Sequence, residues 1–100
     1  MRKYRAIPTV VLGRRFDSKA EARRYGELLL LGQAGKIQNL ELQPQFGLSG
    51  VAIYRADFAY DDLETGARVV EDVKGFDTPM SKLKRKLVQA QHGVTVEIVR

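Results

Sequence analysis

The spacing of hydrophobic residues first indicates a helix that begins after Ser18. Ser18 can act as its N-cap, and Glu21 stands at the capping-box position three residues later. The leucine run 28–31 predicts burial on most sides of this helix, and Gly35 suits the left-handed conformation that often follows a helix. We therefore expect a helix from Ser18 to the neighbourhood of Gly35.

Three stretches after this helix have the composition of strands. Residues 40–46 alternate hydrophobic and polar side chains, and Pro44, which cannot donate a backbone hydrogen bond, favours an edge or bulged strand. Residues 51–60 and 68–74 are rich in β-branched and aromatic side chains and flank a turn that contains Asp61 and Gly66. These two stretches are expected to pair as a hairpin.

The last part of the chain predicts a second helix and a closing strand. Thr78 is a suitable N-cap, Pro79 suits the first helical position, and Gly93 marks the end of the helix. One apolar stripe along this helix is formed by Met80, Leu83, Leu87 and Ala90. Residues 94–99 alternate as a strand does.

The resulting order is helix, three strands, helix, strand, which places the chain in the α/β (α+β) class. A chain of 100 residues rarely encloses two separate interiors, and no repeat or linker-like stretch is visible. The sequence therefore predicts a single domain over residues 1–100 with one core.

The composition restricts which binding partners and which metal ions are expected. Seventeen Lys and Arg residues against twelve Asp and Glu give a net charge of +5, which favours a polyanion such as DNA. With no cysteine and one histidine, metal ligands should be carboxylates and carbonyls, which Mg²⁺ and Mn²⁺ prefer. No membrane-spanning stretch or export signal is visible, so we expect a cytoplasmic protein without a membrane partner.

Three residues on the predicted hairpin could carry phosphodiester chemistry. Asp72 and Lys74 are two positions apart on one strand and so share a face, and Asp57 lies on the strand before it. Pairing of the strands would let both carboxylates share a cation, which neutralises phosphate charge and acidifies water, while the lysine orients that water. The alternative is a solvated surface pair, but the neighbouring valines predict buried strands, where unpaired carboxylates are unfavourable.

These residues, in this order of elements, resemble the PD-(D/E)xK nuclease superfamily. The resemblance rests on Asp57 and on the run 72–75, Asp-Val-Lys-Gly, and it covers nearly the whole chain. The segments 16–22, 40–44, 56–58 and 71–75 are also similar to a family of small phage and prophage proteins assigned to that superfamily. Ala56 stands where the superfamily often has a proline.

The resemblance implies a restriction-endonuclease-like α-β-β-β-α-β core with a central mixed sheet flanked by helices. It further implies that Mg²⁺ or Mn²⁺ is held by Asp57, Asp72 and the Val73 carbonyl, and that Lys74 serves the attacking water. A glutamate on the first helix supplies or supports a metal site in related nucleases, and Glu21 is the residue that matches. A helix cap explains the position of Glu21 equally well.

Two other polar residues lie near these acids in the sequence. Gln43, on the strand before Asp57, could contact the metal or a phosphate, although a strand glutamine is more often simply solvated. Glu71 points to the opposite strand face from Asp72, which favours a structural role.

Two basic groups could contact DNA phosphates, although a solvated helix face explains each cation as well. The first turns of the second predicted helix carry Lys82, Lys84, Arg85 and Lys86, and positive charges there oppose the helix dipole unless an anion lies nearby. The second group contains Arg2, Lys3, Arg5, Arg14 and Arg15.

Together these observations predict a Mg²⁺-dependent DNA endonuclease of phage or prophage origin. By the same resemblance it would leave 5′-phosphate and 3′-hydroxyl ends. A junction-resolving enzyme would act as a homodimer, because two strands need two sites, and a larger recombination or replication complex could supply target choice. The competing hypothesis is a DNA-binding or assembly module with a nuclease-like fold and no catalysis.

Overall fold

The computed structural model describes residues 9–50 and 52–100, so the basic residues Arg2, Lys3 and Arg5 lie outside the described part. The two helices are α1 (Lys19–Gln33) and α2 (Pro79–His92). The described strands are β1 (Thr9–Val11), β2 (Arg14–Phe16), β3 (Ile37–Leu42), β4 (Gln45–Leu48), β5 (Ala52–Arg55), β6 (Phe58–Asp62), β7 (Arg68–Val73) and β8 (Val96–Val99).

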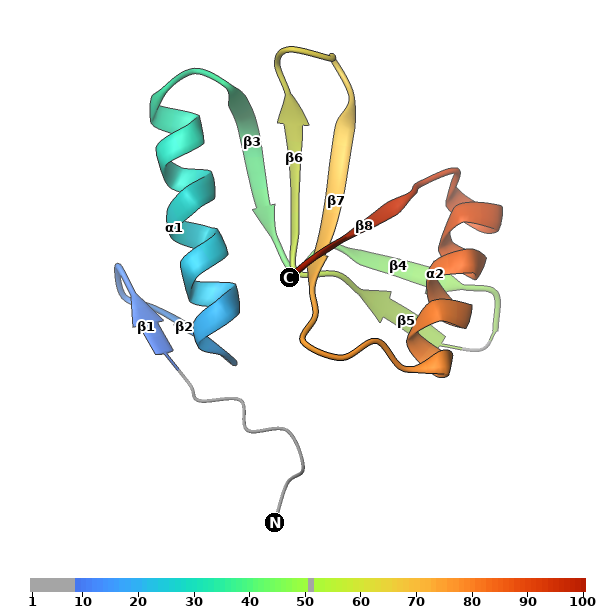
Figure 1. Cartoon of the computed structure of the whole chain (residues 1–100). Helices are drawn as coiled ribbons and strands as arrows, with labels where there is room; N and C mark the ends of the chain where they lie inside the picture. Colours follow the sequence, from blue (N-terminus) through green and yellow to red (C-terminus); the bar gives the residue numbers. More distant parts are fainter. Residues whose placement is uncertain (1–8, 51) are drawn as a thin grey trace.

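The central element is a mixed sheet of four strands in the order β3-β6-β7-β8. Strands β3, β6 and β7 pair antiparallel, and β8 pairs parallel to β7, with Asp72 opposite Ile98. Along the chain, α1, β3, β6, β7, α2 and β8 follow the predicted α-β-β-β-α-β order (Figure 1). The mixed α and β class expected from the sequence is confirmed.

Two of the predicted strands are in fact each divided in two. The chain leaves β3 at Gln43, which has a positive φ of 54°, and β4 begins only after Pro44. It bends again at Ala56 and Asp57, between β5 and β6. Strands β4 and β5 therefore form a hairpin of their own, inserted between β3 and β6. The prediction of one continuous strand over residues 51–60 was wrong.

The hairpin of β6 and β7 is confirmed, and its register positions the acids. Phe58 lies opposite Glu71 and Asp61 opposite Arg68. The turn is closed by a hydrogen bond from the Asp62 N–H to the Ala67 carbonyl. The acids of interest consequently lie at the opposite end of this hairpin from its turn.

The first helix begins as the sequence predicts. The Ser18 side chain caps it by accepting a hydrogen bond from the Glu21 N–H at 3.1 Å, and Gly35 adopts a positive φ of 74° just after it. Burial differs along the leucine run, because Leu28 is fully buried whereas Leu30 is 66% exposed. Burial on most sides of α1 was therefore an overestimate.

The second helix also has its predicted bounds, but a different face is buried. Thr78 caps it, and Gly93 follows it in the left-handed conformation. The fully buried residue is Val88, and the half-buried Ser81 and Arg85 lie on the same side. Met80 is 60% exposed and Leu83 is 51% exposed, so the predicted apolar stripe lies largely outside the core.

The sheet divides the hydrophobic interior into two clusters, where the sequence had predicted one core. One cluster lies against α1 and contains Tyr25, Leu28 and Phe58. The other lies between the sheet, the β4–β5 hairpin and α2, and contains Val70 and Val88. Alternate residues of β6 and β7 serve the two clusters, as the period of a strand requires. Figure 1 shows α1 beside β3, and α2 beside β4 and β5.

The small hairpin of β1 and β2 packs against the first turns of α1 (Figure 1). In the described part of the chain neither helix has the length and apolar character required to cross a membrane.

Candidate active site

Asp57 lies at the bend between β5 and β6, and three hydrogen bonds to backbone groups of other residues fix its position. Its N–H donates to the Glu71 carbonyl at 3.0 Å, and its carbonyl accepts from the Gln43 N–H at 2.9 Å. Its carboxylate oxygen Oδ2 accepts from the Val73 N–H at 2.7 Å. The side chain of Asp57 is therefore directed at β7, beside Asp72.

Asp72 lies near the end of β7 and Lys74 directly follows this strand, with both side chains on the same side, as the sequence predicts. The Lys74 ammonium lies 3.7 Å from Oδ2 of Asp72. Asp72 is only 3% exposed, whereas Lys74 is half-buried. The Lys74 N–H donates to the Val99 carbonyl at 2.9 Å, so the neighbouring strand β8 holds the backbone here.

Tyr54 is a member of this site that the sequence did not reveal. It is buried on β5, and its hydroxyl donates a hydrogen bond to Oδ2 of Asp72. The contact depends on the bend at Asp57, because β5 belongs to a different sheet from β6 and its Tyr54 side chain reaches Asp72 on β7. A tyrosine in an alternating strand gives no sign of such a bend.

Glu21 comes from the first turns of α1 and faces the two aspartates. Burial and the nearby charges of Asp57, Asp17 and Asp72 raise the pKa of Glu21 to about 7. Burial likewise raises the pKa of Asp57, against the effects of the Val73 N–H and Lys74. It raises the pKa of Asp72 too, although Lys74 opposes it. Raised pKa values in a cluster of acids are typical of functional sites.

The oxygen ligands here are of the type that a hard divalent cation prefers, and a cation would relieve the repulsion among the three acids. Among the described residues, no three Asp, Glu or His side chains converge closely enough to form a complete ligand set. Mg²⁺ does not require one, since it commonly uses one or two carboxylates together with water and substrate phosphate. Asp57, Asp72 and the Val73 carbonyl fit that pattern, with Glu21 at the edge of the site.

A cavity of about 370 Å³ opens beside Glu21 and Asp57. Its other walls are the β1–β2 hairpin and the end of β3, which contribute Arg14, Arg15 and Gln43. No carboxylate in the described part of the chain forms an ion pair with either arginine. The cavity is thus lined by two acidic residues and by two arginines that have no carboxylate partner among residues 9–50 and 52–100.

The Lys and Arg side chains of α2 differ in their exposure and in their ion pairs. Arg85 is engaged with Asp77, with nitrogen to oxygen distances of 2.8 and 2.5 Å, and its charge contributes to lowering the pKa of Asp72 against the larger effect of burial. Lys84 is half-buried, while Lys82 and Lys86 are exposed. The two exposed lysines are therefore available to solvent, whereas Arg85 is tied to the loop that follows β7.

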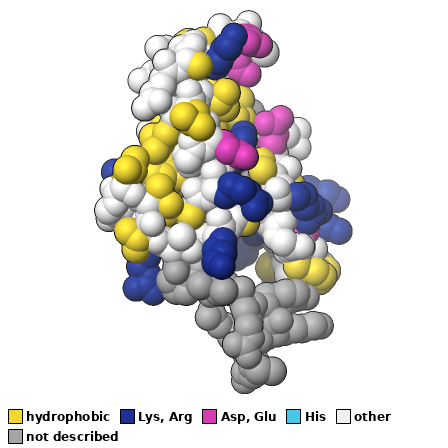
Figure 2. Space-filling model, turned by 60° about the vertical axis from the view of Figure 1, so that its left-hand side comes forward, with side chains coloured by type: hydrophobic (Ala, Val, Ile, Leu, Met, Phe, Trp, Pro, Cys, Tyr) yellow, Lys and Arg dark blue, Asp and Glu magenta, His cyan; other side chains and the backbone are white. Residues whose placement is uncertain are grey.

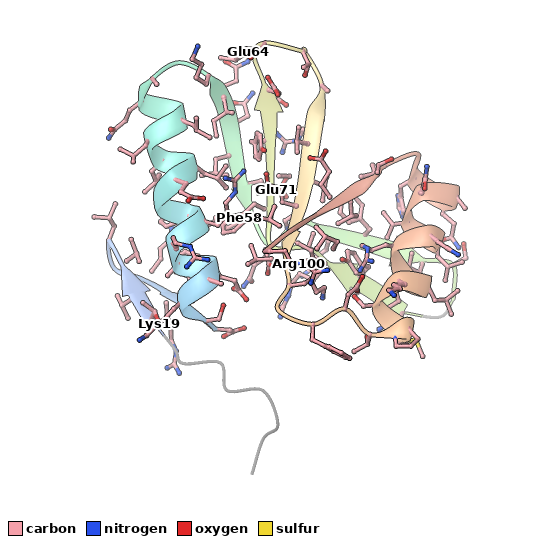
Figure 3. All side chains as sticks on the ribbon, viewed as in Figure 1. Lys19, Phe58, Glu64, Glu71 and Arg100 are labelled. Atoms are coloured by element: carbon pink, nitrogen blue, oxygen red, sulfur yellow. The ribbon has the colours of Figure 1, made fainter. Side chains whose placement is uncertain are left out.

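Glu71 has the structural role that its strand position predicts. It is 2% exposed, faces α1, and accepts two hydrogen bonds from Arg24, at 2.9 and 2.7 Å. The Tyr60 hydroxyl donates to it at 2.5 Å. Figure 3 shows Glu71 and Phe58 in the middle of the molecule, with Lys19 at the start of α1 and Glu64 at the turn between β6 and β7.

The family described as "Protein of unknown function (DUF1064)" matches residues 1–99, and the chain belongs to this family. No curated protein matches the chain, and no solved structure does.

Proposed function

We propose that this member of the DUF1064 family is a metal-dependent endonuclease that hydrolyses DNA phosphodiester bonds. The observation that carries the proposal is the convergence of Asp57, Asp72 and Lys74, with Glu21 facing them from α1. The resemblance to PD-(D/E)xK nucleases, stated above for the sequence, agrees with this arrangement. The order of elements and the parallel pairing of β8 with β7 add support at the level of the fold.

Each residue has a distinct task in this proposal. A divalent cation held by Asp57, Asp72 and the Val73 carbonyl would neutralise phosphate charge and make water more acidic. Lys74 lies beside Asp72 and would orient the attacking water or stabilise negative charge that develops on the phosphate. Tyr54 holds the Asp72 carboxylate in place through its hydroxyl. Glu21, with its pKa near 7, would take up or release a proton at neutral pH.

The reaction is a hydrolysis and needs no other reactant. The water oxygen bonds to phosphorus, the bond from phosphorus to O3′ breaks, and O3′ takes up a proton. The products are a 5′-phosphate and a 3′-hydroxyl.

DNA as the substrate is supported by charge. The chain carries a net charge of +5, and most of the charged side chains in the lower part of the coloured surface in Figure 2 are Lys and Arg. Acidic side chains on this face lie mostly in its upper half (Figure 2). A basic surface next to clustered acids favours an anionic substrate bound with a cation, because the acids alone would repel it.

The test is cleavage of labelled four-way-junction, duplex and single-stranded DNA in Mg²⁺ or Mn²⁺. Wild type is compared with Asp72→Asn and Lys74→Ala, and with Glu97→Gln and Lys36→Ala as controls. Both control residues are exposed, Glu97 on β8 and Lys36 near the far turn of the β6–β7 hairpin. We expect cutting that requires metal, is lost in both site variants and persists in both controls.

Metal binding supplies a second measurement that does not depend on cutting. Thermal unfolding with and without Mn²⁺ should show stabilisation of wild type that Asp72→Asn lacks. DNA binding without any cutting, under all of these conditions, would overturn the proposal in favour of a non-catalytic DNA-binding module.

A further inference from the structure

The β1–β2 hairpin presents an exposed leucine at its turn. Val11 pairs with Arg14, so Leu12 and Gly13 are the two loop residues. Both have positive φ, 49° and 79°, as type I′ turns require. Leucine is unfavourable in this conformation because of its Cβ, whereas asparagine followed by glycine is the preferred pair. Leu12 is nevertheless 79% exposed and buries little apolar area in return.

The same hairpin forms a wall of the cavity beside Glu21 and Asp57. Gly13, Arg14 and Arg15 line it together with the two acids. A volume of about 370 Å³ is that of a small-ligand pocket and is too small for a double helix. If DNA enters the cavity, it enters as a single strand or as one nucleotide turned out of the stack.

The charges of the cavity match such a nucleotide. Arg14 and Arg15 are exposed, and neither has a carboxylate partner in the described part of the chain. They can therefore bind phosphate oxygens without first breaking an ion pair. The amide of a glutamine can donate to and accept from the edge of an unpaired base, and Gln43 lines the same cavity.

We propose that this cavity receives a single unpaired nucleotide and that Leu12 stacks on the last base pair beside it. The inference rests on the nuclease function proposed above and gives its substrate class: DNA in which pairing ends near the cut, such as forks and flaps. Apolar side chains that enter between base steps are a known means of opening a duplex. Arg14 and Arg15 would hold the phosphates of the displaced strand.

Binding to three DNA probes tests the proposal without any cleavage. The protein carries Asp72→Asn, and the probes are a single strand, a blunt duplex and a fork with unpaired arms. A fluorescent adenine analogue at the end of the paired region reports unstacking by a rise in emission. We expect tighter binding to the fork than to the blunt duplex, and a rise in emission only with the fork.

The decisive variant is Leu12→Asn, because it should fold at least as well as the parent. Asparagine suits the turn, so the thermal midpoint should stay the same or rise. Fork binding should fall about tenfold, towards that of the blunt duplex, with loss of the emission change and unaltered single-strand binding. Arg14→Ala with Arg15→Ala should weaken single-strand and fork binding about tenfold or more. Arg23→Ala, exposed on α1 and outside the cavity, is the control.

The outcomes separate the two proposals. Equal affinity for fork and blunt duplex, or fork binding and emission unchanged by Leu12→Asn, would overturn the role of the hairpin while leaving the nuclease function in place. Fork binding with unstacking by a wild-type protein that never cuts in Mg²⁺ or Mn²⁺ would overturn the nuclease function instead. The cavity would then be a binding site for single-stranded DNA.

Discussion

The carboxylate of Asp57 accepts a hydrogen bond from the backbone N–H of Val73, at 2.7 Å. This bond joins the bend just before β6 to the end of β7, between Asp72 and Lys74. The paired residues of β6 and β7 end at Phe58 and Glu71, so the Val73 N–H has no backbone partner on β6. The Asp57 carboxylate accepts its hydrogen bond instead. Asp57 therefore holds the backbone together, and in the function proposed above it would also bind a cation.

Two substitutions at Asp57 should separate these tasks. Asp57→Asn keeps an oxygen that can accept from Val73 and removes a charge that burial disfavours, so stability should be unchanged or increased. Cleavage should nevertheless fall at least about 100-fold. Asp57→Ala leaves the Val73 N–H without its partner and should lower the free energy of unfolding by about 1 to 3 kcal/mol. Urea unfolding measures the stability of each variant, and cleavage rates measure its activity. Equal losses of stability in Asp57→Asn and Asp57→Ala would contradict the role of the Asp57 carboxylate as acceptor for the Val73 N–H.

The raised pKa of Glu21 predicts how stability changes with pH in the absence of metal. Its pKa is about 7 in the folded chain and 4.5 in the reference state, so the folded state binds more protons between these values. The stabilisation is complete below about pH 4.5 and is lost as the pH rises through 7. Its size is about 1 to 2 kcal/mol, because Glu21 is only half-buried and solvent screens its charge.

Thermal unfolding between pH 4.5 and 8 measures this change, with Glu21→Gln as the comparison. The variant should show a flatter profile than wild type. Mg²⁺ favours ionised carboxylates, so it should stabilise wild type more at pH 8 than at about pH 5. A profile in Glu21→Gln as steep as that of wild type would mean that other groups cause the pH dependence.

Tyr54 should act on the reaction through Asp72. Tyr54→Phe removes the hydroxyl that donates to the Asp72 carboxylate, and so removes a bond that stabilises its charged form. The pKa of Asp72 should rise further, and the acidic limb of the pH–rate profile should move to higher pH. The loss of stability should be modest, about 1 kcal/mol. A lower rate with an unshifted pH profile would indicate a packing role only.

Arg24 should be important for stability and of little direct importance for chemistry. Its guanidinium binds the buried carboxylate of Glu71, so Arg24→Ala leaves that charge unpaired. We expect a loss of about 2 to 4 kcal/mol in the free energy of unfolding. Glu71→Leu combined with Arg24→Leu should recover part of the loss, and the exposed neighbour Arg23→Ala should change little.

Lys82 and Lys86 should contribute to DNA affinity through phosphate contacts alone. Each change to alanine should weaken binding to the same degree for every sequence and lower the salt slope of log K by about one. Arg85→Ala should in addition destabilise the fold, because it removes the pair with Asp77. Binding titrations from low to moderate salt distinguish these effects. A lysine variant that changes sequence preference would indicate base contact instead.

Much of the fold was predictable because local chemistry determines it. Ser18 and Thr78 cap the two helices, and the Asp62 to Ala67 turn closes the β6–β7 hairpin. Asp72 and Lys74 share a face because strands have a period of two. Glu71 faces the other way for the same reason.

The features of the fold and the site that the sequence did not predict depend on contacts between residues far apart in the chain. Alternation continues through Ala56 and Asp57, so nothing in the pattern shows that the chain leaves one sheet for another. The contact of Tyr54 with Asp72 is a consequence of that bend. In α2, Met80 and Leu83 formed the most hydrophobic stripe, yet the buried side is the one that carries Val88 and Arg85, whose charge is paired with Asp77.

The parallel pairing of β8 with β7 has a consequence for the order in which the site is completed during folding. Asp72 lies opposite Ile98, and the Lys74 N–H binds the Val99 carbonyl. Parallel neighbours cannot be joined by a tight turn, so β8 reaches this position only after the chain has crossed over through α2. Until β8 docks, the outer edge of β7 lacks its hydrogen bonds, and the lysine backbone has no fixed place. The position of Lys74 beside Asp72 therefore depends on a strand that follows it by more than twenty residues, so the candidate site is complete only when β8 has been added to the sheet.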